Sequence, residues 1–164
     1  MITNKNFSGT GVAIVTPFEK DGRVDEKSLK QHVEFLISNG VNYIVALGTT
    51  SEAPTLSSEE KVNVVSKIIE VNKGRVPLMV GVGGYSTQQV IDDFSKFNIP
   101  DVDAFLSVAP YYNKPNQEGL YAHFAEIAKA SPKPIIMYNI PSRTSVNMLA
   151  ETTLKLARDF ENII

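Results

Sequence analysis

The sequence contains no cysteine, and this absence removes several kinds of chemistry at once. A disulfide scaffold, a zinc site built on thiolates and a cysteine nucleophile are all excluded. The segment from Met1 to Gly11 is polar and lacks the apolar core of a secretory signal. No apolar run approaches the ~20 residues of a membrane helix. We therefore expect a cytoplasmic protein without a membrane partner, since a chain without cysteine fits a reducing compartment.

The chain also has no excess of positive charge, and histidine is scarce. The 164 residues include 16 basic and 18 acidic side chains, which gives a formal net charge of −2. Proteins that bind nucleic acid present clustered Lys and Arg, so a nucleic-acid partner is not expected. The two histidines, His32 and His123, fall within predicted helices, and we interpret them as surface or satisfied packing residues. No spacing of His, Asp or Glu indicates a metal site.

What the chain does contain is a recurring alternation of strand and helix patterns. Short apolar runs rich in β-branched residues predict strands at 12–16, 43–47, 77–82, 104–108 and 134–138. Amphipathic stretches predict helices at 26–38, 58–72, 87–97, 117–130 and 147–160. Residues 162–164 have the character of the start of a sixth strand. Because the strand runs are almost continuously apolar, we expect parallel strands that are buried on both faces.

Local signals fix several helix ends. Asp25 is the expected N-cap of the first helix, which ends at Asn39-Gly40, and Ser57 is the expected N-cap of the second helix. On that second helix, Val62, Val65 and Ile69 are the residues expected to face the core.

Strand–helix alternation fits either an open doubly wound sheet or a (β/α)8 barrel. A dinucleotide-binding open sheet needs a glycine-rich turn after its first strand, and residues 16–20 contain no glycine. Gly81, Gly83 and Gly84 lie at the end of the third strand and just beyond it, but Ser86 occupies the position where the fingerprint needs another glycine. We interpret these glycines as a tight turn.

Polar residues follow three of the predicted strands, in segments 48–52, 110–119 and 138–144. Taken singly, a threonine pair usually serves a turn, and a tyrosine near a strand end usually packs with its hydroxyl at the rim. Ligands of parallel α/β folds bind at the carboxyl ends of the strands. Hydroxyl groups and one guanidinium at equivalent ends of three strands therefore predict a binding or active site.

The motifs in these segments resemble those of the dihydrodipicolinate synthase family, also called 4-hydroxy-tetrahydrodipicolinate synthase. They are Gly48-Thr49-Thr50-x-Glu52, Pro110-Tyr111-Tyr112-Asn113-x-Pro115-x-x-Glu118-Gly119 and Tyr138-Asn139-Ile140-Pro141-x-Arg143-Thr144. The resemblance extends over essentially the whole chain. It implies an α/β fold in which residues 1–164 form one partial domain, the first five β/α units of a (β/α)8 TIM barrel with parallel strands.

The same resemblance implies a lyase of lysine and diaminopimelate biosynthesis. Such an enzyme condenses pyruvate with aspartate semialdehyde to 4-hydroxy-tetrahydrodipicolinate, through a Schiff base to a lysine on the sixth strand. The family uses neither a metal nor an organic cofactor. The resemblance also implies a homo-oligomer, a dimer or a tetramer.

Residue roles follow from the matched motifs. By resemblance, Thr49 and Thr50 hold the pyruvate carboxylate, and Arg143 binds the carboxylate of the semialdehyde. Thr50, Tyr112 and Tyr138 form a proton relay, with Tyr112 reaching into the site of the neighbouring subunit. A planar guanidinium suits a carboxylate, and an arginine at position 143 favours this branch over the related N-acetylneuraminate lyases.

The sequence departs from the family pattern at two kinds of position. Ser51 and Ser145 stand where the family often has glycine, which matters if either residue needs a positive φ. The Schiff-base lysine is expected beyond Ile164, and none of the twelve lysines present matches it. We therefore expect that residues 1–164 alone do not catalyse the condensation. A non-catalytic fragment that acts only in self-association, or an N-acetylneuraminate lyase-like relative, stays open as an alternative.

Overall fold

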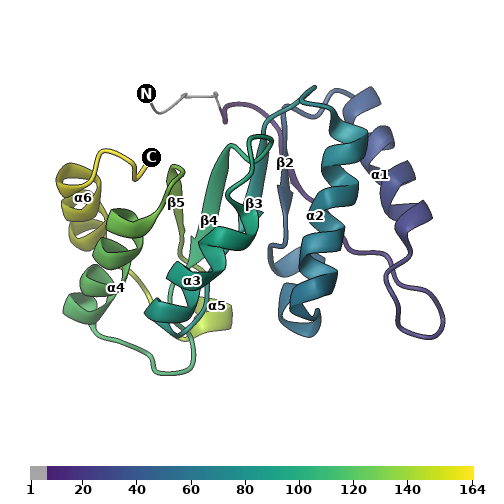
Figure 1. Ribbon diagram of the computed structural model, residues 1–164. Helices are drawn as coiled ribbons and strands as arrows, with labels where there is room; N and C mark the ends of the chain where they lie inside the picture. The colour runs from purple at the N-terminus through teal and green to yellow at the C-terminus, as the bar shows by residue number, and fades with distance from the viewer. Residues whose placement is uncertain (1–6) are drawn as a thin grey trace. The chain divides into compact units, whose positions relative to one another are not determined.

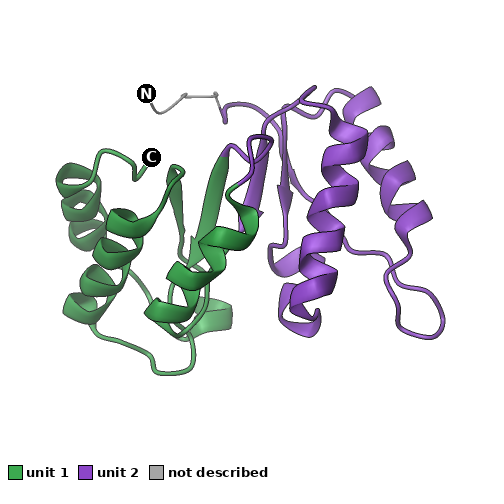
Figure 2. Cartoon of the chain, in the orientation of Figure 1, with its two compact units in different colours: residues 1–2, 82–98, 104–164 green, residues 3–81, 99–103 purple. Residues whose placement is uncertain are grey.

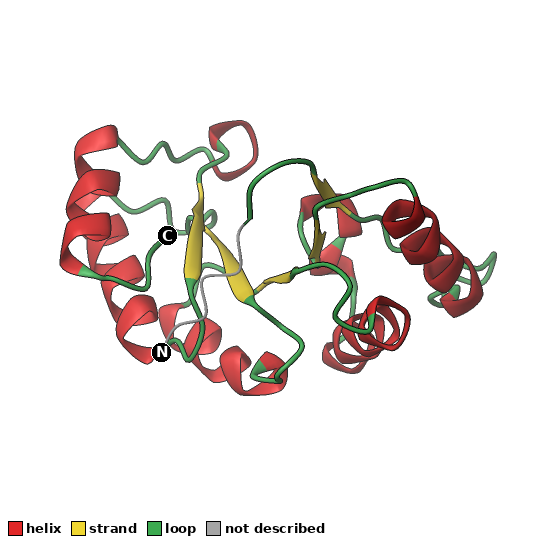
Figure 3. Ribbon diagram, turned by 90° about the horizontal axis from the view of Figure 1, so that it is seen from above, coloured by secondary structure: helices red, strands yellow, loops and turns green. Residues whose placement is uncertain are grey.

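The computed structural model describes residues 7–164, and these divide into two compact units (Figures 1 and 2). Unit 2 contains residues 7–81 and Ile99–Asp103, and unit 1 contains Val82–Asn98 and Ala104–Ile164. In both units, short strands alternate along the chain with helices, as predicted (Figure 3). No helix in the described part of the chain combines the length and the apolar character that a membrane span requires.

Unit 2 is built on three parallel strands in the order β1 (Gly11–Ala13), β2 (Tyr43–Ala46) and β3 (Leu78–Gly81). Ile44 of β2 lies opposite Val12 of β1 and Leu78 of β3. Strands β2 and β3 are buried over most of their length, but Gly11 and Ala13 are exposed. The expectation of complete burial is therefore wrong for β1, which is an edge strand.

Two helices of unit 2, α1 (Glu26–Ser38) and α2 (Ser58–Asn72), pack against each other and have the predicted bounds. The carboxylate of Asp25 accepts a hydrogen bond from the Ser28 backbone N–H at 2.9 Å, and Ser57 forms a capping box with Glu60. Both predicted N-caps are confirmed, because each side chain accepts from a backbone N–H of the first helical turn.

The buried face of α2 agrees only in part with the predicted one. Val65 is buried as predicted, but Val64 and Ile68 are also buried, whereas Val62 is 42% exposed. The apolar residues of this helix are spread over about half of its circumference, so more than one stripe fits the helical period. Tertiary packing selects the buried stripe, which the period of the sequence alone does not determine.

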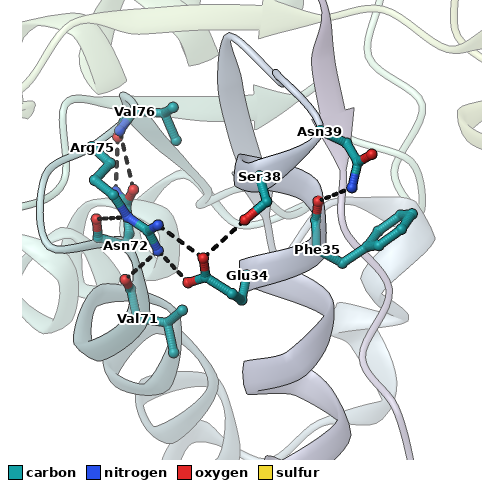
Figure 4. Close-up of polar contacts among 8 residues, drawn as sticks. All are labelled: Glu34, Phe35, Ser38, Asn39, Val71, Asn72, Arg75 and Val76. Atoms are coloured by element: carbon teal, nitrogen blue, oxygen red, sulfur yellow. Dashed lines mark hydrogen bonds and ion pairs between the residues drawn. The ribbon is translucent and has the colours of Figure 1, made fainter.

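Polar contacts join the C-terminal ends of α1 and α2 (Figure 4). Arg75 donates to both carboxylate oxygens of Glu34, at 3.0 Å from Nη1 and 2.5 Å from Nη2. The guanidinium of Arg75, aided by the hydroxyl of Ser38, lowers the pKa of Glu34 to about 2. Asn72 donates to the Val76 carbonyl at 2.8 Å and accepts from the Val76 N–H at 3.1 Å. These contacts define the turn that leads into β3.

Strand β2 ends at Ala46, one residue earlier than predicted, because Leu47 adopts a left-handed conformation with φ 54°. Leu47 is buried, and its carbonyl lies so close to Gly81 that a Cβ at position 81 would overlap it. A side chain is therefore excluded at position 81, and the reversal at Leu47 directs the chain into the candidate segment that begins at Gly48.

Unit 1 contains two parallel strands, β4 (Ala104–Val108) and β5 (Ile135–Tyr138). Its helices are α3 (Thr87–Phe97), α4 (Gln117–Ala130), α5 (Pro141–Thr144) and α6 (Ala150–Asp159). Helix α4 packs against both α3 and α6, and the ring of Phe94 stacks on Phe105 with centroids 4.9 Å apart. Large fully buried side chains of this unit include Phe105, Leu120, Phe124, Ile127, Ile135 and Leu156.

Several predicted bounds in unit 1 need correction. The helix predicted over 147–160 begins only at Ala150, and the short helix α5 was not predicted. Strand β5 begins after Pro134, because proline lacks the N–H of a strand residue. Ile163 forms a parallel bridge with Ile135, as the strand-like pattern at 162–164 predicted.

His123 lies in α4 and is only 5% exposed. Its Nδ1 lies 2.8 Å from the hydroxyl oxygen of Thr87, but Nε2 has no hydrogen-bond partner among the described residues. The interpretation as a satisfied packing residue is therefore correct for one ring nitrogen and wrong for the other. Burial lowers the pKa of His123 to about 4, since the charged ring would lose its hydration.

Candidate active site

Thr49 and Thr50 lie in a single 3-10 turn, η1 (Thr49–Ser51), which Gly48 separates from the left-handed Leu47. A second such turn, η2 (Ala53–Thr55), follows it. Thr50 is exposed and Thr49 is half-buried, so both hydroxyls lie near the surface of unit 2 at the carboxyl end of β2.

Ser51 anchors this turn to the segment after β1. It is fully buried, and its hydroxyl donates to the carbonyl of Ile14 at 2.5 Å. The hydroxyl of Thr16 in turn donates to the Ser51 carbonyl at 2.8 Å. The turn that carries the threonine pair is thus held through its last residue, Ser51, which donates one buried hydrogen bond and accepts another.

The two serines that replace a common family glycine differ in conformation. Ser145 has φ 56°, in the left-handed region, as the C-cap of α5. Within residues 7–164, Ser51 is not among the residues with positive φ. The conformational cost considered for both positions therefore applies to Ser145 and not to Ser51.

Tyr138 ends β5, and the segment with Tyr112 follows β4. Because β4 and β5 pair in parallel, with Val108 opposite Tyr138, their carboxyl ends lie at the same edge. The Ala109 N–H extends this pairing by donating to the Tyr138 carbonyl at 3.0 Å. Figure 1 shows α5 and the segment before α4 beyond these strand ends.

Three tyrosines form a cluster before and after β4, which we call the tyrosine cluster: Tyr85, Tyr111 and Tyr112. The ring of Tyr85 lies 5.4 Å from Tyr111 and 5.6 Å from Tyr112, measured between centroids. Asn113 donates to the Tyr85 carbonyl at 3.1 Å and so ties the two segments together. Burial, with a smaller contribution from Tyr85, raises the pKa of Tyr111. Tyr112 is 79% exposed and projects from the surface of unit 1.

Arg143 lies in the middle of α5, and its side chain is exposed. The backbone around it is well bonded: Thr144 donates its hydroxyl to the carbonyls of Ile140 and Val146, and its hydroxyl oxygen accepts from the Val146 N–H. The guanidinium itself has no hydrogen bond or ion pair to any residue in the described range. A fixed backbone with an unpaired guanidinium is the arrangement that a carboxylate ligand requires.

Two amide side chains hold the chain just beyond α5. Asn139 contacts Asn147 and Met148, and Gln117 contacts Asn147, Leu149 and Thr152. Sequence reasoning did not select either residue for a role. Asn139 stood within a quoted motif, but its partners lie eight and nine residues later, in a stretch predicted as helix.

Unit 1 therefore brings the segments of Tyr112, Tyr138 and Arg143 to one edge of a parallel strand pair. Thr49 and Thr50 belong to unit 2, at the carboxyl end of β2, and their grouping with the other three residues stays a prediction. Within residues 7–164, no group of three or more His, Asp or Glu side chains is arranged to hold a metal ion.

The sequence pattern of the Dihydrodipicolinate synthetase family matches residues 6–164. The chain belongs to this family. Curated 4-hydroxy-tetrahydrodipicolinate synthases from Flavobacterium psychrophilum and Parabacteroides distasonis are 54% and 50% identical to it, over 96% and 97% of the chain. The alignments cover 54% of each relative, so the chain spans about half the length of these dihydrodipicolinate synthetase family members.

Solved structures of the dihydrodipicolinate synthetase family have the same fold as this chain. The chloride-inhibited dihydrodipicolinate synthase from Acinetobacter baumannii, complexed with pyruvate, matches with a TM-score of 0.93 and 48% identity. The match covers 97% of this chain and 54% of that one. The fold class predicted from the sequence, five β/α units of an incomplete TIM barrel, is confirmed.

Proposed function

We propose that the protein that carries this chain condenses pyruvate with aspartate semialdehyde to 4-hydroxy-tetrahydrodipicolinate. The observation that carries the proposal is the exposed guanidinium of Arg143, five residues after Tyr138 and without a hydrogen bond or ion pair to any of residues 7–164, within a chain of this family. The relatives named above as 4-hydroxy-tetrahydrodipicolinate synthases, and the pyruvate bound by the Acinetobacter baumannii enzyme, support it.

Pyruvate is the proposed first substrate, held by its carboxylate at Thr49 and Thr50. Both threonines carry a hydroxyl, a group that donates hydrogen bonds to carboxylates, and both lie in the 3-10 turn η1. The Schiff base to a lysine of the complete protein then converts pyruvate into an enamine, which is the nucleophile of the condensation.

The proton transfers of imine formation and enamine attack are assigned to Thr50, Tyr112 and Tyr138. Each assisted proton transfer contributes roughly 10²–10⁴-fold to a rate. Tyr138 is the last residue of β5 and so lies at the carboxyl end of the strand, where we expect the substrates to bind. The position of Tyr112, 79% exposed, suits a phenol that enters the site of a neighbouring subunit.

The proposed assembly is a dimer or a tetramer of this protein. Its support is the tyrosine cluster, in which three aromatic rings project from one region of unit 1 and are between 36% and 79% exposed. Aromatic side chains gathered on a surface are typical of contacts between subunits.

The test uses the full-length protein. Borohydride reduction in the presence of pyruvate should give a stoichiometric mass increase on intact protein, and addition of aspartate semialdehyde should consume pyruvate and give the condensation product. N-acetylneuraminate serves as the control substrate. Absence of the pyruvate adduct, or cleavage of N-acetylneuraminate at the rate of the condensation, would contradict the proposal.

A further inference from the structure

Gln117 and Asn139 belong to different elements, yet their side chains converge on one short segment, residues 147–149. Gln117 is the first residue of α4, and Asn139 directly follows β5. Gln117 donates from Nε2 to the Asn147 carbonyl at 2.8 Å, and its Oε1 accepts from the Leu149 N–H at 3.0 Å. The same oxygen accepts from the Thr152 hydroxyl at 2.7 Å.

Asn139 closes the other side of the segment. Its Oδ1 accepts from the Met148 N–H at 3.0 Å. Its Nδ2 donates to Oδ1 of Asn147 at 2.8 Å and lies 3.4 Å from the Met148 carbonyl oxygen. Every hydrogen-bonding atom of the two amides is used, and this satisfaction of donors and acceptors fixes both rotamers.

The loop that these contacts close carries Arg143. The chain leaves β5 at Asn139, forms the single turn α5, reverses at the left-handed Ser145 and returns to Met148. A helix of four residues has no stability of its own, because a helical nucleus is unfavourable before several turns form. The orientation of α5 therefore depends on the contacts at the base of the loop.

We propose that Gln117 and Asn139 are positioning residues that hold Arg143 in place for the carboxylate of the second substrate. The proposal rests on the proposed function. Neither amide touches Arg143. They act through the loop, whose ends they fasten to β5 and to the start of α4, while the bonds of Thr144 make its interior stiff.

The geometry makes a distinctive kinetic prediction. A displaced Arg143 weakens recognition of the semialdehyde, whereas formation of the pyruvate imine does not involve this loop. Misplacement of a binding group by about 1 Å can cost up to a hundredfold in rate. Loss of either amide is therefore expected to affect the two substrates unequally.

The experiment compares Gln117→Ala, Asn139→Ala and Arg143→Ala in the full-length protein. KM and kcat are measured for each substrate, together with the borohydride-trapped pyruvate adduct. Both amide variants should raise the semialdehyde KM roughly tenfold or more, with the pyruvate KM and the adduct unchanged. Gln117→Glu keeps the oxygen that accepts from the Leu149 N–H and loses the donor to the Asn147 carbonyl. Its semialdehyde KM should therefore lie between those of the wild type and Gln117→Ala.

Gln88→Ala is the matched control, because Gln88 donates within α3, to Asp92, and has no contact with the loop. The inference would be overturned if the amide variants raised the KM of both substrates equally. It would also be overturned if neither amide variant changed the semialdehyde KM while Arg143→Ala raised it. If Gln117→Ala does not fold, Asn139→Ala and Gln117→Glu carry the same comparison. A wild-type protein without a pyruvate adduct would overturn the proposed function, and this inference with it.

Discussion

At the scale of single residues, Arg143 combines a fixed backbone with an exposed side chain that pairs with none of the residues that the structure describes. In the full-length protein, Arg143→Ala should lower kcat/KM for the semialdehyde by roughly tenfold to a hundredfold, since a charge-assisted hydrogen bond contributes about 1.5–3 kcal/mol. Trapping of the pyruvate imine should stay at the wild-type level. Steady-state kinetics with the semialdehyde varied at saturating pyruvate measure the effect.

Arg158→Ala is the control for the loss of one surface arginine, because Arg158 is exposed on α6. Semialdehyde kinetics that are the same in wild type and Arg143→Ala would remove Arg143 from the site.

Ser51 and Ser145 make a second comparison at the same scale. Ser145→Gly should raise the free energy of unfolding by up to about 1 kcal/mol, because glycine adopts the left-handed conformation without a Cβ clash. Ser51→Gly should lower it by about 1–2 kcal/mol, because a buried hydrogen bond to Ile14 is lost. Chemical denaturation of the intact protein measures both, and effects of equal sign would contradict this assignment.

At the scale of elements, the contact between α1 and the turn after α2 depends on one ion pair. Arg75→Ala should return the pKa of Glu34 from about 2 toward its ordinary value, since Arg75 is the main cause of the shift and Ser38 the lesser one. NMR titration of the Glu34 carboxyl measures the change. Lys30→Ala is the control. It removes the ion pair between Lys30 of α1 and Glu70 of α2, and it should leave the pKa of Glu34 at its lowered value.

The contact between α3 and α4 predicts an acid-dependent loss of stability. The unfolded state binds a proton at His123 near pH 6.5, whereas in the folded state burial lowers this pKa to about 4. The unfolded state therefore binds more protons between these values, and the stability present above pH 6.5 falls as the pH drops toward 4, by on the order of 2–3 kcal/mol.

His123→Phe should remove this part of the pH dependence, because it keeps an aromatic ring in the core and has no group to protonate. His32→Gln, which replaces the other histidine, is the control and should retain the acid-dependent loss. Melting temperatures of the three proteins from pH 7 to pH 4 decide the matter, and parallel curves would show that His123 is not responsible.

The elements were predictable from sequence where local signals agree with packing. Asp25 and Ser57 cap helices with the predicted bounds, since a cap is a local interaction between neighbouring residues. The start of α6 was not predictable, because Asn147 and Leu149 are bonded to the side chains of Gln117 and Asn139 rather than within a helix. Long-range contacts of this kind leave no periodic trace in the sequence.

At the scale of the whole molecule, residues 1–164 expressed alone should form no borohydride-stable pyruvate adduct. A nucleophilic lysine needs a desolvating pocket to lower its pKa. Lys133 precedes β5 at the wrong end of the strand, and Lys114, which follows β4, is exposed. Intact mass after reduction with pyruvate tests the expectation, and a stoichiometric adduct on the 164-residue chain would contradict it.

The sequence predicted the fold class and the family from features that are spread along the chain, namely apolar strands, capped helices and three motifs. It could not predict which residues support the motifs. Ser51 and Gln117 each have partners more than twenty residues away, and such pairs exist only after the chain is folded.

The close approach of Leu47 and Gly81 also constrains how this protein can vary over evolution. The left-handed turn at Leu47 places its carbonyl where any side chain at position 81 would have to lie. A lineage could exchange Gly81 for a larger residue only after the chain at position 47 had adopted another conformation. The two positions should therefore change together among descendants of this sequence, although neither side chain belongs to the proposed site.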